Sequence, residues 1–305
     1  MSSTNTRRQI VTFDGGGIKG IITSVLLQRL VKTYPALLRK TTLMAGTSTG
    51  AIIAACISIG MKPNEIVELY RDNADDIFEK KFYRVGLFYR KYSHDFLKKL
   101  LKKIFGDTKL GDIDNKILIP VFDLDNHDVE PMRTWKPKFF NNYEGSGDCD
   151  MEFWKVLLYT TSAPVYFPTS DGYIDGGVIA NNPSIAALSN VLKESGRLGA
   201  LSKMKNFRLL SFGTGKTRQY ISGDHTWGAG QWAMPLLSIL FEGANDVADY
   251  QCRTLLGDRY YRVNPEIPKS DDFNMDSADK VEEMIDLANG VDLYEAEKWI
   301  EDFWL

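Results

Sequence analysis

The chain has 305 residues, 44% of them hydrophobic, and a formal net charge of −3 at pH 7. This length allows one large domain or two small ones, and the composition allows a sizeable buried core. The slightly acidic balance argues against a general nucleic-acid-binding protein, which normally carries an excess of Lys and Arg.

The predicted strands and helices alternate along the chain. Short apolar runs at 9–13 and 41–45 predict strands, and each is followed by glycine and then by a helical pattern. Residues 51–60 are too apolar for a surface helix and predict a buried one. Alternating strands and helices imply an α/β fold, in which helices cover both faces of a mostly parallel sheet. The other predicted strands are 116–124 and 207–215, and the other predicted helices are 21–30, 64–79, 94–105, 152–161 and 184–194.

No internal repeat, low-complexity tract or linker divides the sequence. Residues 125–150 are polar and predict irregular structure, and the residues from about 266 onward are acidic. We therefore expect a single domain over residues 1–305, with a core at about 9–265 and a C-terminal helical extension at 266–305.

Three consecutive glycines, residues 15–17, lie between the first predicted strand and the first predicted helix. With Gly20 they fit the dinucleotide-binding fingerprint G-x-G-x-x-G. That fingerprint also requires an acidic residue about 20 positions further on. No Asp or Glu occurs between Asp14 and Glu65, which argues against a dinucleotide site.

A second possible nucleotide motif is GTGKT at residues 213–217. A phosphate-binding P-loop requires glycine at the position that Leu210 occupies, so the motif is incomplete. The run predicts the end of a strand followed by a turn. A nucleotide-binding module that uses either glycine-rich loop is kept as an alternative function.

Residues 46–50, GTSTG, match the pattern G-x-S-x-G between a predicted strand and a predicted helix. In this pattern the serine lies on a strained turn with its oxygen exposed, at the positive end of the helix. Gly46 and Gly50 are needed because the strand and the helix crowd together around Ser48. The simpler interpretation is a turn that caps a helix. Acyl transfer also creates an oxyanion that backbone N–H groups stabilise, so we interpret residues 15–17 as an oxyanion loop.

A nucleophilic serine needs a base, and the chain has only three histidines. His94 precedes a Lys-rich helix and His127 lies in a polar loop, so both are predicted to be surface residues. His225 follows Asp175, so a Ser-Asp-His triad in the order of α/β-hydrolases is one possible mechanism.

The other candidate base is the carboxylate of Asp175 itself. Gly176 and Gly177 follow it directly and let the main chain pass close to another loop. The simpler interpretation is a reverse turn, because Asp-Gly is a common turn pair. The residues alone leave the triad and the histidine-free pair as alternatives.

Taken in order, these motifs resemble those of the patatin-like phospholipase family. Residues 14–20 resemble its oxyanion motif and residues 46–50 its nucleophile turn. The resemblance runs from about residue 9 to 290. Its other parts are residues 162–164, 166–168 and 175–177, and the later stretches 180–183, 211–215, 248–265 and 275–290.

The resemblance implies a three-layer α/β/α fold and a Ser–Asp dyad without histidine. Ser48 would be the nucleophile and Asp175 the base. The substrates would be esters of membrane lipids: phospholipids, lysophospholipids or galactolipids. Neither calcium nor another metal or cofactor is expected. The oxyanion would be held by N–H groups of Gly15, Gly16, Gly17 and Ile18.

An enzyme that cleaves membrane lipids must reach a bilayer. Residues 94–107 have apolar side chains on one helical face and four lysines on the other, which is typical of a helix that lies on an anionic membrane. The alternative is a helix packed on the domain with a solvated lysine face. Residues 84–92 are aromatic and basic, and they border the acyl entrance or belong to the core.

The three cysteines are widely spaced and predict free thiols in a reducing compartment. The start of the chain lacks the apolar segment of a signal peptide. We therefore expect a cytoplasmic protein that associates peripherally with membranes. Some bacterial patatin-like proteins degrade the host membrane in antiviral defence after a cyclic-nucleotide signal, which suggests such an activator here. A storage or interaction protein is a further alternative.

Overall fold

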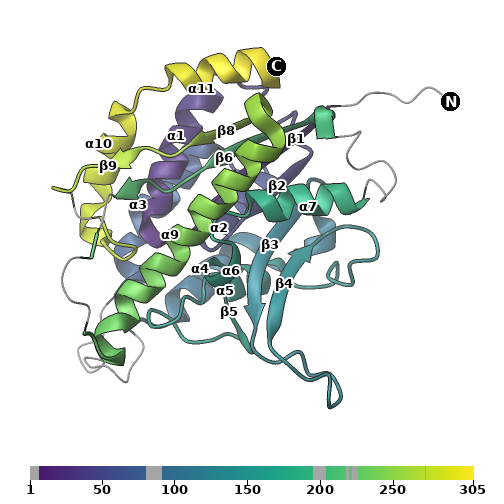
Figure 1. The fold of residues 1–305 in the computed structure, drawn as a ribbon, viewed down its shortest axis with the longest axis vertical. Coiled ribbons are helices and arrows are strands. Elements are labelled where there is room, and N and C mark those ends of the chain that lie inside the picture. Colours follow the sequence, from purple (N-terminus) through teal and green to yellow (C-terminus); the bar gives the residue numbers. More distant parts are fainter. Residues whose placement is uncertain (1–6, 80–90, 195–203, 218–219, 222–225, 272) are drawn as a thin grey trace.

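The computed structural model describes residues 7–79, 91–194, 204–217, 220–221, 226–271 and 273–305. Its centre is a sheet with the strand order β4-β3-β2-β1-β6-β8, to which β5 is added beside β3 (Figure 1). The strands are β1 (Arg8–Phe13), β2 (Leu43–Gly46), β3 (Lys116–Asp123), β4 (Lys136–Asn141), β5 (Tyr173–Asp175), β6 (Phe207–Phe212) and β8 (Tyr260–Val263), and β7 (Lys216–Thr217) pairs separately with β9 (Glu266–Ile267).

Most neighbouring strands of this sheet run parallel. β1 pairs in parallel with both β2 and β6, whereas β4 and β5 run antiparallel to β3. β1 is an apolar run that is buried from Gln9 to Phe13, as expected for a strand covered on both faces. Phe13 is in register with Gly46, so the loops that follow β1 and β2 meet at one edge of the sheet.

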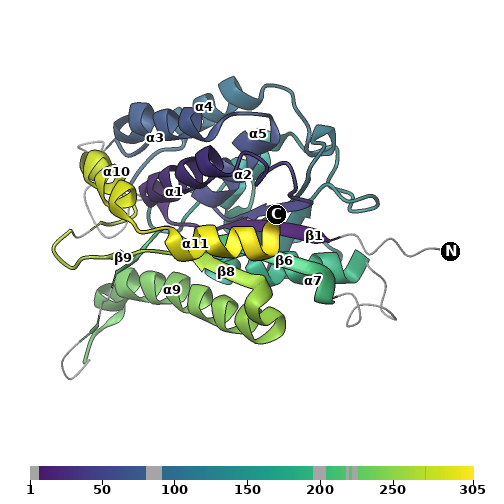
Figure 2. The same ribbon diagram turned by 90° about the horizontal axis from the view of Figure 1, so that it is seen from above.

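Helices cover both faces of the sheet, so the predicted three-layer α/β/α fold is confirmed (Figure 2). Val11 and Phe13 of β1 point into a core shared with α1, α2 and α5, whereas Ile10 points into a second core shared with α7 and the end of α9. The helices are α1 (Gly20–Thr33), α2 (Thr49–Ser58), α3 (Pro63–Ile77), α4 (Asp95–Phe105), α5 (Phe153–Thr160), α6 (Gly177–Ala180), α7 (Ser184–Glu194), α9 (Ala229–Leu256), α10 (Val281–Gly290) and α11 (Tyr294–Trp299).

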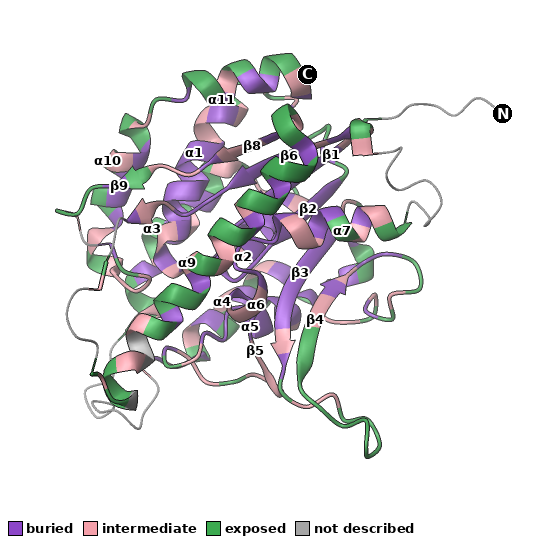
Figure 3. Ribbon diagram, viewed as in Figure 1, coloured by how far each residue is buried: buried purple, intermediate pink, exposed green. Residues whose placement is uncertain are grey.

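Two elements differ from the sequence prediction. The expectation of irregular structure over 125–150 is wrong at β4, where Lys136–Asn141 pairs antiparallel with β3 as an edge strand and only Phe140 is fully buried. The long helix α9 was not predicted. Its inner face packs against α6, α7 and β8, and its outer face is exposed along much of its length (Figure 3).

Helix α4 has the packed arrangement rather than the membrane-lying one. Leu97, Leu101 and Phe105 of its apolar face are buried, and the ring of Phe105 contacts Phe153 of α5 at 5.2 Å between centroids. The lysines on its other face are exposed. Residues 84–90 of the aromatic and basic segment lie outside the described residues.

The acidic C-terminal segment packs against elements that precede it in the chain. α10 lies against α1, and α11 lies against β8. The indole N–H of Trp304 donates to the carbonyl of Leu37 at 3.0 Å, and the indole is fully buried. Within the described part of the chain, no helix is both long enough and apolar enough to span a bilayer.

Candidate active site

Ser48 lies in the turn that joins β2 to α2. β2 ends at Gly46 and α2 begins at Thr49, so Ser48 is the N-cap residue of a buried helix, as predicted. Its backbone has φ 54° and ψ −123°, a conformation that costs a residue with a side chain about 1–3 kcal/mol. A strained strand-to-helix turn of this kind is the geometry that presents a nucleophilic serine.

Gly46 and Gly50 make this turn possible because no side chain fits at either position. A Cβ atom at Gly46 would lie 2.2 Å from the carbonyl oxygen of Gly50. A Cβ atom at Gly50 would lie 2.2 Å from the carbonyl oxygen of Phe13. Both clashes are with backbone atoms, which cannot rotate away. The predicted crowding of strand and helix is confirmed.

Thr160, the last residue of α5, fixes the backbone of Ser48. Its hydroxyl accepts the N–H of Ser48 at 3.0 Å and donates to the carbonyl of Pro120 in β3 at 2.7 Å. The side chain is fully buried. Sequence analysis missed Thr160, because 112 residues separate it from Ser48 and it belongs to none of the recognised motifs.

Replacing Thr160 with valine keeps the shape and removes the hydroxyl. The buried N–H of Ser48 and carbonyl of Pro120 then lose their partner, so we expect a loss of about 1–3 kcal/mol in the free energy of unfolding. The displaced Ser48 should also lower the rate of ester hydrolysis by roughly tenfold or more. Urea denaturation and initial rates on a soluble ester measure both effects. Thr160→Ser keeps the hydroxyl, is the control, and should behave as the wild type. A valine variant with the same stability and the same rate as Thr160→Ser would show that the hydroxyl of Thr160 does not position Ser48.

Asp175 ends β5 and is held beside β3 by pairing with Val121. Its carboxylate is almost fully buried and accepts the N–H of Gly177 at 2.7 Å. Burial raises the pKa of Asp175 to about 7, whereas Gly177 and the side chain of Ser48 act to lower it. Ser48 and Asp175 line the same cavity, although 127 positions separate them in the sequence.

The glycine loop passes directly beside this pair. The N–H of Gly15 donates to the carbonyl of Asn181 at 3.0 Å, and the N–H of Ile18 donates to the carbonyl of Met275 at 2.9 Å. These two groups therefore have other acceptors, and this geometry does not support them as oxyanion donors. Within the described part of the chain, the N–H groups of Gly16 and Gly17 have no such acceptor, and both residues line the cavity that holds Ser48 and Asp175.

A buried ion pair supports the start of the loop. Arg262 of β8 donates to both carboxylate oxygens of Asp14, at 2.5 and 3.2 Å, and to the hydroxyl of Ser211 at 2.9 Å. The carboxylate of Asp14 keeps the pKa of Arg262 above its ordinary value despite burial. Arg262 did not emerge from sequence analysis as a site residue, because its partner Asp14 lies 248 residues away.

The cavity that holds Ser48 and Asp175 is mainly apolar. Its walls come from α2, α3, α4, the segment after α5, and α9. Such a lining fits an acyl chain, and α4 contributes to it through Leu97. The apolar residues that line it are Ile52, Tyr70, Ile77, Phe78, Leu97 and Phe167.

The structure describes two of the three histidines, and one of these two differs from the prediction that both lie at the surface. His94 is buried, with its ring stacked on Phe167 at 5.2 Å between centroids, so its prediction as a surface residue is wrong. His127 is exposed beside Asp125, as predicted. His225 lies outside the described residues.

Two further sequence predictions concern cysteines and metals. All three cysteines have free thiols, as predicted. In the described ranges no group of three or more His, Cys, Asp or Glu side chains is arranged to hold a metal ion.

The α/β fold, with a serine on a strained strand-to-helix turn, has the features of a serine hydrolase. A family model of the patatin-like phospholipases matches residues 11–188, which is more than half of the chain, so the chain belongs to this family. It is accordingly a lipid acyl hydrolase.

Similar proteins occur in bacteria and plants. The chain is 27% identical to Protein teg of Priestia megaterium over 327 residues, covering 98% of this chain and 99% of that protein. It is 26% identical to Patatin-like protein 1 of Arabidopsis thaliana, covering 89% and 77% of the two chains. Among solved structures, VipD from Legionella pneumophila aligns with a TM-score of 0.46 and 12% identity, over 92% of this chain and 67% of that one.

Proposed function

We propose that the chain cleaves membrane-lipid esters with a Ser48–Asp175 dyad. The single observation that carries the proposal is that one apolar cavity is lined both by Ser48, on its strained turn, and by the buried carboxylate of Asp175. A carboxylate whose pKa lies near 7 is matched to proton transfer at neutral pH. The acyl chain of the substrate would occupy the apolar cavity.

In the first half of the reaction, Asp175 takes the proton of Ser48 as its Oγ attacks the ester carbonyl carbon. The oxygen of that carbonyl becomes an anion and is stabilised by the N–H groups of Gly16 and Gly17. When the tetrahedral intermediate collapses, the ester C–O bond breaks and Asp175 gives its proton to the departing alkoxide. The product that leaves is the deacylated lipid, and Ser48 carries the acyl group.

In the second half, water takes the place of the departed lipid. Asp175 removes a proton from this water, and the resulting hydroxide attacks the acyl carbon. The second oxyanion uses the same N–H groups. Collapse breaks the bond to Ser48 Oγ, returns the proton to Ser48 and releases a fatty acid.

Labelling with a fluorophosphonate tests the nucleophile, and a histidine substitution tests the base. We expect the probe to attach to the peptide that contains Ser48, and the wild-type label to be lost in Asp175→Ala. We expect His225→Ala to retain labelling and hydrolysis, because the dyad needs no histidine. A folded His225→Ala variant without activity would favour the Ser-Asp-His triad, and tight nucleotide binding without any labelling would favour the nucleotide-binding alternative.

Peripheral membrane association and activation by a cyclic nucleotide in bacterial defence stay predictions from the family resemblance. Hydrolysis of phospholipid vesicles with and without added cyclic dinucleotides tests the activator. An unchanged rate would remove that part of the hypothesis.

A further inference from the structure

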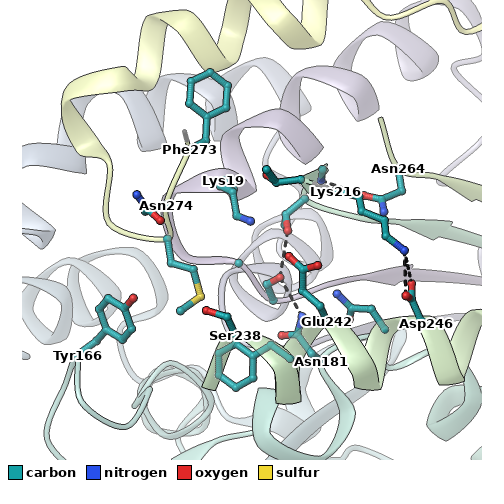
Figure 4. A pocket seen from close by; sticks show the side chains of 18 residues that line it. Lys19, Tyr166, Asn181, Lys216, Ser238, Glu242, Asp246, Asn264, Phe273 and Asn274 are labelled. Carbon is teal, nitrogen blue, oxygen red and sulfur yellow. Dashed lines mark hydrogen bonds and ion pairs between the residues drawn. The ribbon is translucent and has the colours of Figure 1, made fainter. Parts of the chain in front are cut away.

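A second cavity, which Gly15 and Gly16 of the glycine loop also line, adjoins the acyl cavity (Figure 4). Both cavities are lined by Gly16, Tyr166, Asn181, Phe241 and Met275, so they meet beside the loop. An ester held at Ser48 can therefore extend in two directions. The acyl chain fits the apolar cavity, which leaves the second cavity for the alcohol part of the ester.

The second cavity differs in chemistry because its walls carry charged and polar side chains. Lys19, from the turn before α1, and Glu242, from α9, both point into it (Figure 4). Burial lowers the pKa of Lys19, and Glu242 opposes this effect, so the two charges influence each other through the cavity. The remaining polar lining includes Thr214, Ser238, Asn245 and Asn274.

Among the residues that line this cavity, neither Lys19 nor Glu242 forms a hydrogen bond or an ion pair with another (Figure 4). Two other charged residues of the same cavity, Lys216 and Asp246, do form an ion pair, with 2.8 Å between Nζ and Oδ1. A partly buried charge is stabilised when a ligand supplies the opposite charge. A cation and an anion that line one cavity without contacting each other are complementary to a ligand that carries both charges.

We propose that this cavity binds a phosphoethanolamine headgroup, with Lys19 on the phosphate and Glu242 on the ammonium. The proposal rests on the proposed lipid hydrolase function and specifies its substrate class. A primary ammonium has three N–H donors, which the carboxylate of Glu242 and the hydroxyl of Ser238, one turn earlier on α9, can accept. A choline headgroup has no N–H donor and is held better by an aromatic cage than by a carboxylate.

Detergent mixed micelles that contain one phospholipid each test the headgroup preference. The lipids are ethanolamine, choline and glycerol phospholipids with the same acyl chains, and p-nitrophenyl butyrate is a soluble ester without a headgroup. We expect wild type to prefer the ethanolamine lipid, and Glu242→Gln to reduce that preference by roughly tenfold, because a charge-assisted hydrogen bond is lost. Hydrolysis of p-nitrophenyl butyrate should stay unchanged.

Lys19→Gln should slow hydrolysis of all three phospholipids relative to p-nitrophenyl butyrate, since each contains a phosphate, and Lys19→Arg should restore it. Glu283→Gln is the matched control, an exposed carboxylate on α10 that lines neither cavity. Glycerophosphoethanolamine, a soluble headgroup, should inhibit wild type competitively and Glu242→Gln about tenfold less. This arm separates binding in the cavity from effects of the micelle surface.

The headgroup proposal is wrong if Glu242→Gln and wild type show the same ratio of ethanolamine to glycerol phospholipid hydrolysis and the same inhibition by glycerophosphoethanolamine. If p-nitrophenyl butyrate is then still hydrolysed by wild type and not by Ser48→Ala, the proposed dyad stands and only the headgroup proposal fails. Absence of any ester hydrolysis by wild type would instead overturn the dyad, and the headgroup proposal with it.

Discussion

Ser48→Ala is expected to abolish ester hydrolysis, with a rate at least roughly 10⁴-fold below that of wild type. The substitution removes the oxygen that forms the acyl intermediate in the proposed mechanism. The fold should persist, because alanine is smaller than serine and the backbone N–H still donates to Thr160. Initial rates on p-nitrophenyl butyrate measure the loss, and thermal unfolding checks the fold.

Ser58→Ala on the same helix is the matched control for this substitution. Ser58 donates its hydroxyl to the carbonyl of Ala54 and takes no part in the cavity that holds Ser48. We expect it to keep the wild-type rate. A folded Ser48→Ala variant that retains more than about a hundredth of the wild-type rate would contradict a serine nucleophile, whose removal costs far more.

Asp175→Asn is expected to lower the rate of ester hydrolysis by roughly 10³-fold or more, because an amide cannot accept the proton of Ser48. The asparagine oxygen can still accept the N–H of Gly177, so the local structure should be retained. For wild type, the rate should rise with pH through about 7, as Asp175 loses its proton.

The same substitution should raise stability above pH 7. The pKa of Asp175 is about 7 in the folded protein and 3.8 as its ordinary value, so between these values the folded chain holds a proton that the unfolded chain releases. The free energy of unfolding of wild type therefore falls as the pH rises through this window, and the loss is complete above it. A shift of this size corresponds to at most roughly 4 kcal/mol.

Urea denaturation of wild type and Asp175→Asn at pH 5 and pH 8 measures this effect. At pH 8 the free energy of unfolding should be higher for Asp175→Asn than for wild type. At pH 5 this difference between the two proteins should be smaller. Asp107→Asn, an exposed carboxylate at the end of α4, should show no such pH dependence. An asparagine variant that is less stable than wild type at pH 8 would argue against a strained, buried charge at this position.

The sequence predicts the parts of the site that depend on local chain geometry. The turn around Ser48 follows from glycine spacing between an apolar strand and an apolar helix, and the parallel sheet then brings the turn beside the glycine loop. The placement of Ser48 and Asp175 in one cavity is not a local property. The residues alone left Asp175 as a member of a triad or of a histidine-free pair, and the family resemblance favoured the pair.

The parts that sequence analysis missed are contacts between distant segments. Thr160 accepts the N–H of Ser48 from 112 positions away, and Arg262 pairs with Asp14 from 248 positions away. The periodicity of the sequence does not indicate such contacts. The set of candidate oxyanion donors became smaller for the same reason. In the sequence, the N–H groups of residues 15–18 are equivalent candidates. The structure excludes those of Gly15 and Ile18, because they donate to the carbonyls of Asn181 and Met275.

One strand, β3, anchors both members of the proposed dyad. The carbonyl of Pro120 receives the hydroxyl of Thr160, which in turn holds Ser48, and the adjacent Val121 pairs with Asp175. The proposed nucleophile and base are thus both held by neighbouring residues of one strand. A displacement of β3 within the sheet would therefore move both groups in the same direction and disturb their relative position less than a displacement of either one alone.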